Sequence, residues 1–94
     1  MSCLYLISES EKGPVKIGVA KNPLDRISEL QVGNPKRLRL TGAWSMWTRS
    51  DAFDMERAVL EDVAPRRLVG EWVDADESTM RAIVVRRMEE MYPS

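Results

Sequence analysis

The stretch VKIGVAKNP, residues 15–23, combines the pattern of a strand with the start signal of a helix. Apolar residues alternate with others over residues 15–19, which is the period-two pattern of a half-buried strand. Asn22 is a favourable N-cap, and Pro23 suits the first helical position because the N–H that it lacks is not needed there. We therefore expect a strand that leads directly into a helix, which ends near Gly33.

Segments on both sides of this stretch also have clear patterns. Residues 3–7 predict a strand that pairs with residues 15–19 through a polar turn. Residues 38–47 predict a third strand, with a bulge at Gly42. Three segments follow: a helix from Ser50 or Asp51 to about Val63, a short extended piece at residues 70–73, and a final helix at residues 76–91 with Met80, Ile83, Val84, Met88 and Met91 on its inner face.

The order of these elements is ββαβα, followed by the extended piece and the final helix. This order is typical of an α/β sandwich, built on a small, mainly antiparallel sheet of three strands flanked by helices. A chain of 94 residues is long enough for one domain and too short for two. We expect one domain over residues 1–94.

The composition restricts the chemistry that this chain can perform. Histidine is absent, which excludes imidazole general bases and most zinc sites. Cys3 is the one cysteine, so no intrachain disulfide forms, as is typical of a reducing compartment. No apolar run reaches the roughly 18 residues of a membrane span, and the N-terminus lacks the features of a signal peptide. We expect a cytoplasmic protein without a membrane segment.

Glu56 interrupts the apolar face of the helix that begins near residue 50. At about 100° per residue, Ala52, Val59 and Val63 fall in one apolar arc, and Glu56 falls inside it. A buried carboxylate without a partner is costly, so Glu56 needs a cation, a hydrogen-bond network or a water-filled cleft. Pairing with a structural arginine or a tyrosine hydroxyl explains the pattern equally well.

Polar side chains share one face of the predicted hairpin. Tyr5 on the first strand lies on the same face as Lys16 and Gly18 on the second. A glycine lets a ligand approach the backbone closely, so this face is a candidate polar site. An ordinary solvent-exposed face with a half-buried Tyr5 also fits the pattern.

Arg26 is a further candidate, at the flank of the apolar stripe of the first helix. That stripe consists of Leu24, Ile27 and Leu30. The planar guanidinium of an arginine suits a phosphate oxygen, although a solvated surface arginine would also lie there.

The order and spacing of these residues resemble the GIY-YIG endonuclease superfamily. The second signature, Lys16-Ile17-Gly18, is similar to that of a short phage and bacterial branch with Lys-Ile-Gly in place of Tyr-Ile-Gly. The resemblance covers about residues 3–74. Its other parts are Cys3-Leu4-Tyr5 in place of Gly-Ile-Tyr, Asn22-Pro23, Arg26, Glu29-Leu30-Gln31, Glu56, and Gly70-Glu71-Trp72-Val73 in place of Gly-Glu-Trp-Phe.

The resemblance implies hydrolysis of DNA phosphodiester bonds with one divalent metal, Mg²⁺ or Mn²⁺, which prefers oxygen ligands. Glu56 would hold the metal, and Arg26 would stabilise negative charge on the phosphoryl oxygens. Tyr5 would orient or deprotonate the attacking water. Gly18 would leave room for the substrate backbone. Lys16 would bind phosphate or act as a base.

Basic residues are concentrated in the middle of the chain, although the formal net charge is −1. Residues 12–67 contain 11 Lys/Arg and 7 Asp/Glu, whereas the two flanks contain 3 and 8. This distribution predicts a positive face for DNA, with an ordinary mixed surface as the alternative. The expected phosphate contacts are Lys36, Arg37, Arg39, Arg66 and Arg67.

Two other functions remain open at this point. The branch often has a histidine four residues after the glutamate, where this chain has Leu60, and the late asparagine of the family has no clear counterpart. A nucleic-acid-binding module that no longer cuts is therefore a second hypothesis. A protein-interaction module is a third, because Trp44, Trp47 and Trp72 are many aromatics for this length. The oligomeric state is open, a homodimer included.

Overall fold

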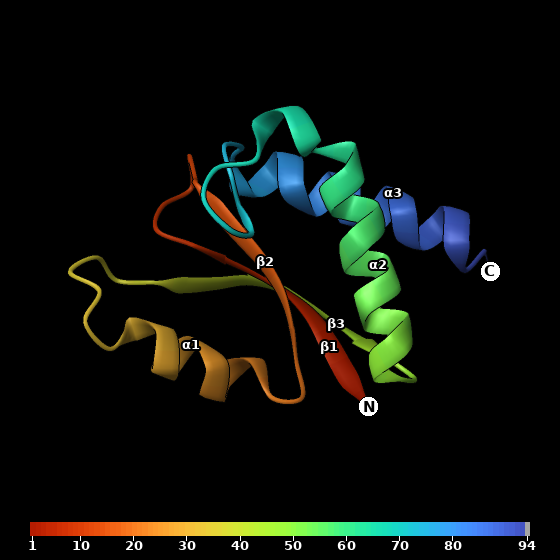
Figure 1. Cartoon of the computed structure of the whole chain (residues 1–94), viewed down its shortest axis with the longest axis horizontal. Helices are drawn as coiled ribbons and strands as arrows, with labels where there is room; N and C mark the ends of the chain where they lie inside the picture. The colour runs from red at the N-terminus through yellow and green to blue at the C-terminus, as the bar shows by residue number, and fades with distance from the viewer. Residues whose placement is uncertain (94) are drawn as a thin grey trace.

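A four-stranded antiparallel sheet forms the centre of the structure, a computed structural model that describes residues 1–93 (Figure 1). The strand order is β3-β1-β2-β4. The strands are β1 (Ser2–Ser8), β2 (Val15–Ala20), β3 (Arg39–Met46) and β4 (Trp72–Val73). The helices are α1 (Pro23–Gln31), α2 (Arg49–Asp62) and α3 (Glu77–Met91), with a short 3-10 turn at Ala64–Arg66. The predicted α/β class and order of elements are confirmed.

The sheet has one strand more than the sequence predicted. The short extended piece joins it as β4, where Val73 pairs with Val15 and Trp72 pairs with Lys16. Only this long-range pairing makes residues 72–73 a strand of the sheet, because so short a segment has little strand signal of its own. As a result, the loop that leads into β4 lies beside β2.

The larger hydrophobic core lies between one face of the sheet and helices α2 and α3. Alternate residues of β1 and β2 point into it, as the period of two requires. Fully burying one such side chain stabilises the fold by about 1.5–3 kcal/mol. Its fully buried members include Leu4, Leu6, Val15, Ile17, Met55, Val59, Met80 and Val84.

A smaller core lies on the opposite face of the sheet, under α1 (Figure 1). Ile27 and Leu30 of α1 pack there against Tyr5 and Ile7 of β1. Leu24 does not: it is 64% exposed, so the predicted stripe was wrong at this position. The reason is that α1 contacts the sheet along a narrow line, and no residue of this helix is fully buried.

Side-chain caps determine where the helices begin. Asn22 Oδ1 accepts hydrogen bonds from the backbone N–H groups of Leu24 and Asp25, at 3.1 and 3.4 Å, as predicted. Helix α2 begins earlier than predicted, because Thr48 is extended and its hydroxyl oxygen accepts from Asp51 N at 3.0 Å. Ser50 and Asp51 are therefore already helical.

Two further expectations concern the edges of the fold. The bulge predicted at Gly42 is confirmed: Leu6 pairs with Gly42 but Ile7 pairs with Leu40, which leaves one extra residue in β3. At the end of α3, Met91 is 37% exposed, so it does not belong to the buried face predicted for it. The terminal turn of α3 extends past the core that α2 covers.

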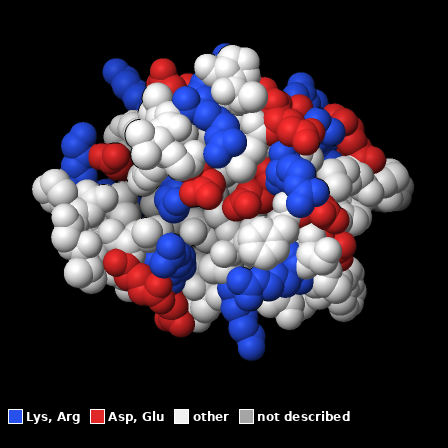
Figure 2. Space-filling view, viewed as in Figure 1, with Lys and Arg blue, Asp and Glu red and all other residues white. Residues whose placement is uncertain are grey.

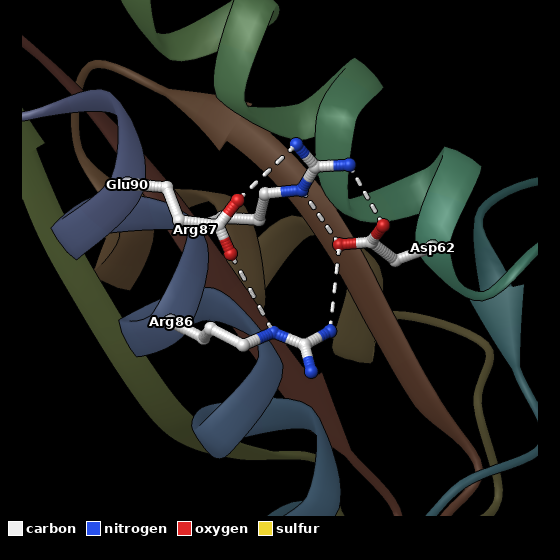
Figure 3. A network of polar contacts seen from close by, with 4 residues as sticks. All are labelled: Asp62, Arg86, Arg87 and Glu90. Atoms are coloured by element: carbon white, nitrogen blue, oxygen red, sulfur yellow. Dashed lines mark hydrogen bonds and ion pairs between the residues drawn. The ribbon is translucent and has the colours of Figure 1, made fainter.

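A polar network joins the C-terminal end of α2 to α3 (Figure 3). Arg87 donates two hydrogen bonds to the carboxylate of Asp62, each 2.7 Å long. Arg86 and Glu90 complete the network. The hydrogen bonds from Arg87 are the main cause that lowers the pKa of Asp62. The network therefore holds α3 against α2 through a charge pair.

A buried carboxylate ties α3 to the sheet at its other end. Glu77 is only 5% exposed, accepts a hydrogen bond from the buried hydroxyl of Ser8, and lies 3.3 Å from Arg39 Nε. A buried carboxylate needs such partners to offset its lost hydration. The ends of α3 are thus fixed by polar contacts, and its middle by the core.

Candidate functional site

Tyr5 and Gly18 face each other on adjacent strands. They are paired in the β1–β2 register, and Tyr5 is only 2% exposed. A methyl group built at Gly18 would overlap both the hydroxyl group and the ring of Tyr5. The space above Gly18 is therefore filled by the Tyr5 phenol. Gly18 therefore makes room for Tyr5, and its expected role beside a substrate backbone stays a prediction.

Arg26 lies beside Tyr5, at the side of α1 that adjoins β2. A hydrogen bond to Glu29 is the main cause that raises the pKa of Arg26, and the Tyr5 hydroxyl is the next. Arg26 Nη1 lies 2.9 Å from Glu29 Oε2 on the helix surface. Exposed pairs of this kind contribute little free energy. Arg26 is therefore free to exchange Glu29 for another anion at small cost.

Lys16 forms an ion pair across the β2–β4 edge. Its Nζ lies 3.2 Å from Glu71 Oε2, and the Lys16 side chain as a whole is 15% exposed. The backbone supports this contact, because Ile17 N–H donates to Glu71 C=O at 3.2 Å. The hydrogen bond from Lys16 is also the main cause that lowers the pKa of Glu71. Glu71 thus holds the Lys16 ammonium in a defined place.

Glu56 lies near this pair, on the half-buried side of α2. Burial is the main cause that raises the pKa of Glu56, and the charge of Glu71 is the second; Lys16 and Arg67 act in the opposite direction. None of the ion pairs within residues 1–93 includes Glu56. The structural partner that would have explained its position is therefore not seen in this part of the chain.

A hollow on the surface opens beside Glu56. Its lining includes Leu60, one turn further along α2, and Arg67, which follows the 3-10 turn. Arg67 Nη2 donates to Gly70 C=O at 3.0 Å, which holds the guanidinium close to the loop that carries Glu71. Glu56 therefore faces a space that solvent or a ligand can enter, with a cation at its side.

The residues around Glu56 fit a hard divalent cation that brings most of its own ligands. No group of three or more Asp, Glu, His or Cys is arranged as a metal cage in the described part of the chain. Glu56 and Glu71 are two carboxylates close enough to affect each other. Magnesium typically uses one or two carboxylates and completes its shell with water and phosphate oxygens. Glu56, with Glu71 nearby, can supply these one or two carboxylate ligands.

The residues expected to contact DNA do not form one cluster. Arg39 lies on β3 and Lys36 just before it, at one edge of the sheet. Arg66 and Arg67 lie beside β4, at the other edge, where Arg67 forms a bridge with Val73. Figure 2 shows basic and acidic side chains interspersed over most of the visible face. The charges on this face thus agree with the mixed-surface alternative.

The basic residues expected to contact DNA also differ in the residues that surround them. Lys36 Nζ lies 3.4 Å from Glu9, and Arg39 is engaged with buried Glu77. Arg37 lines a different hollow, beside Gln31 of α1. Of the five, Arg67 is the one whose charge acts on Glu56.

Glu71 is the site residue to which the sequence assigned no role. Glu71 belongs to the string Gly70-Glu71-Trp72-Val73, but nothing local in the sequence connects it to residue 16. The ion pair exists because β4 pairs with the start of β2. The available signals were the place of Glu71 in this string and its position directly before a short extended segment.

Comparison with known proteins gives one match. A model of the family described as T5orf172 domain matches residues 2–89, nearly the whole chain, and so extends through most of α3. Neither the curated proteins nor the solved structures contain a match. Within residues 1–93, no helix is both long and apolar enough to cross a membrane.

Proposed function

Because the chain belongs to the T5orf172 domain family, which is related to the GIY-YIG endonucleases, we propose that it is a metal-dependent nuclease that hydrolyses DNA phosphodiester bonds. The environment of Glu56 carries this proposal. The carboxylate is half buried, has no ion-pair partner within residues 1–93, and faces a surface hollow. A carboxylate in that position gains more from a bound cation than a solvated one does.

Within this proposal, the chain belongs to the branch whose second signature is Lys-Ile-Gly, here Lys16-Ile17-Gly18. The support is geometric: on β2, Gly18 seats Tyr5, and Lys16 forms an ion pair with Glu71 from the loop before β4. The two outer residues of the signature thus each have a defined partner.

Glu56 is the residue that would hold Mg²⁺ or Mn²⁺, with Glu71 as a nearby second carboxylate. When bound, such an ion neutralises charge on the scissile phosphate and on the oxygen that leaves. The fit rests on the donors present, which are hard oxygen ligands. Lys16 limits how much of Glu71 is available, because the two form an ion pair.

Arg26 and Tyr5 act on the other side of the scissile phosphate. Arg26 exchanges its surface contact with Glu29 for a phosphoryl oxygen, where a guanidinium can donate two hydrogen bonds. The Tyr5 hydroxyl, fixed by Gly18, orients the attacking water. The attacking water gives up one proton to solvent as its oxygen forms the new bond to phosphorus, the bond to the leaving oxygen breaks, and that oxygen takes up a proton from solvent.

Lys16 binds a phosphate oxygen rather than acting as a base. Its ammonium is already held in place by Glu71, and most of the side chain is buried. A fixed positive charge of this kind stabilises the negative charge that develops on the phosphate. Nicking of plasmid DNA by the wild type and by Glu56→Ala is the experiment that tests the whole proposal.

One observation favours a second function, which is binding of nucleic acid without cleavage. Leu60 lines the same hollow as Glu56, at the place where the branch often has a histidine. An apolar side chain there cannot donate or accept a proton. This alternative predicts binding that weakens as salt rises, with intact DNA in the presence of Mg²⁺ or Mn²⁺.

A further inference from the structure

Of the three tryptophans, Trp47 is the one whose side chain is exposed to solvent. It is 85% exposed, whereas Trp44 and Trp72 pack against the two cores. Moving a large aromatic side chain out of water is favourable, so an aromatic side chain that is exposed on the surface is suited to binding a partner. Neither the core nor the site around Glu56 explains Trp47.

Two basic residues stand beside Trp47. Lys21 and Arg49 line the same surface hollow, together with Val19 and Ala20 at the end of β2. Neither of the two forms an ion pair with any residue in the range 1–93. Arg49 is steadied by Phe53, whose ring centre lies 5.4 Å from the guanidinium carbon. An aromatic surface with two cations that form no ion pair within residues 1–93 is chemically matched to a nucleotide.

This hollow adjoins the candidate catalytic surface. Ala20 and Lys21 also line a second hollow, whose wall includes Arg26. In Figure 1 the end of β2 and the start of α2 lie at the same lower end of the molecule, and Figure 2 shows basic side chains projecting at that edge. Ala20 and Lys21 thus connect the hollow beside Arg26, which Asp25 and Glu29 also line, to the hollow beside Trp47.

We propose that Trp47, Lys21 and Arg49 form a binding site for one unpaired nucleotide of the DNA. This inference rests on the proposed nuclease function, because it places the nucleotide on the strand that Arg26 contacts. The base stacks on the indole, and the two cations contact its phosphates. Every base has a stacking face, so such a site is tolerant of sequence.

The site defines a class of substrate. A base inside a duplex is already stacked on its neighbours, whereas a base in a flap, a bubble or a single-stranded end has a free face. The proposal therefore assigns to this protein DNA that contains an unpaired segment. Blunt duplex DNA can still reach Arg26 and Lys16, but it gains nothing from Trp47.

The test measures binding in EDTA, so that no cleavage is needed. Fluorescence anisotropy follows labelled thymidine oligonucleotide and labelled blunt duplex, at one fixed salt concentration. Trp47→Ala weakens binding of the single strand about 5- to 100-fold and changes duplex binding less than about twofold. Trp47→Phe retains most of the affinity, since phenylalanine also stacks. Val32→Ala, which removes another side chain that is more than four-fifths exposed, is the matched control and has no effect.

Tryptophan emission gives a second readout. The oligonucleotide quenches the emission of the wild type, and Trp47→Phe removes most of that quenching because Trp44 and Trp72 are partly buried.

Equal single-strand affinity of wild type and Trp47→Ala overturns the proposal. A dimer that Trp47→Ala converts to a monomer, with DNA binding unchanged, also overturns it and assigns the surface to a second copy. The binding assay contains no metal, so its result does not depend on cleavage. Whether wild type and Glu56→Ala nick DNA is a separate test, which bears on the nuclease function alone.

Discussion

Lys16 Nζ lies 3.2 Å from Glu71 Oε2 and thereby connects β2 to the loop that enters β4. The pair neutralises one carboxylate beside Glu56 and leaves Glu56 itself without an ion-pair partner in residues 1–93. Burial and Glu71 together raise the pKa of Glu56. A half-buried carboxylate without an ion-pair partner, such as Glu56, lowers the stability of the folded protein. Destabilising features of this kind are common at functional sites.

Replacement of Glu56 by glutamine should make the protein more stable near neutral pH. The pKa of Glu56 is raised above its ordinary value of 4.5 in the folded protein. The folded state then holds its proton more tightly than the unfolded state, so stability falls as pH rises from about 4.5 through the raised folded value. Glu56→Gln removes this loss. Thermal unfolding in EDTA should show a higher Tm than wild type at pH 7, and equal Tm values below pH 4. A lower Tm at pH 7 would mean that Glu56 is a stabilising structural residue.

Replacement of Glu71 by glutamine should change the acidity of Glu56. Glu71 is the second cause of the raised pKa of Glu56, after burial. Glu71→Gln therefore lowers that pKa and moves the acid limb of the kcat/KM profile to lower pH. Glu61→Gln is the control, because Glu61 lines the same hollow but is not among the groups that shift Glu56. An unmoved acid limb in Glu71→Gln would exclude electrostatic contact between the two carboxylates during turnover.

Gly18→Ala should destabilise the protein through Tyr5. The added methyl group overlaps the Tyr5 phenol, and forced overpacking of this kind typically costs about 1–3 kcal/mol of unfolding free energy. Urea unfolding measures this loss, and nicking should fall as Tyr5 is displaced. In a Tyr5→Leu background the same substitution should cost less, because the smaller side chain leaves room. An equal cost in both backgrounds would show that Gly18 does not seat Tyr5.

Asp62→Asn should loosen α3 from α2 in a pH-dependent way. Hydrogen bonds from Arg87 lower the pKa of Asp62 below its ordinary value of 3.8. The pair therefore contributes stability that is present above about pH 3.8 and is lost as pH falls through the lowered folded value. Asp62→Asn should reduce Tm at pH 7 and approach the wild type in acid. Asp54→Asn removes only a 3.9 Å surface contact with Arg57 and should leave Tm nearly unchanged; an equal effect of both substitutions would argue against the network.

Local signals predicted much of this architecture. Asn22 and Pro23 mark the start of α1 because a cap depends on residues two or three positions away. Glu56 could be singled out because helix periodicity alone places it among apolar neighbours. The resemblance to the GIY-YIG endonucleases links Tyr5, Arg26 and Glu56 in one hypothesis; the family match supports the relationship to that superfamily, and the joint role of the three residues stays a prediction.

Features that depend on distant contacts were not predictable in this way. The contact of Glu71 with Lys16, 55 positions away in the chain, depends on the pairing of β4 with β2. The exposure of Leu24 depends on how little of α1 reaches the sheet. The space at Gly18 looked open to a ligand because periodicity puts Tyr5 on the same face without showing that its ring fills it.

The most direct test of the central claim is nicking of supercoiled plasmid DNA in Mg²⁺ or Mn²⁺. Wild type should convert the plasmid to the nicked form, and Glu56→Ala should reduce the rate about a hundredfold or more, a typical loss when electrostatic stabilisation of a transition state is removed. Glu89→Gln, an exposed carboxylate on α3, should cut at the wild-type rate. Equal nicking by wild type and Glu56→Ala would contradict the assignment of Glu56 as the catalytic metal ligand, and an intact plasmid with both would contradict nuclease activity on this DNA.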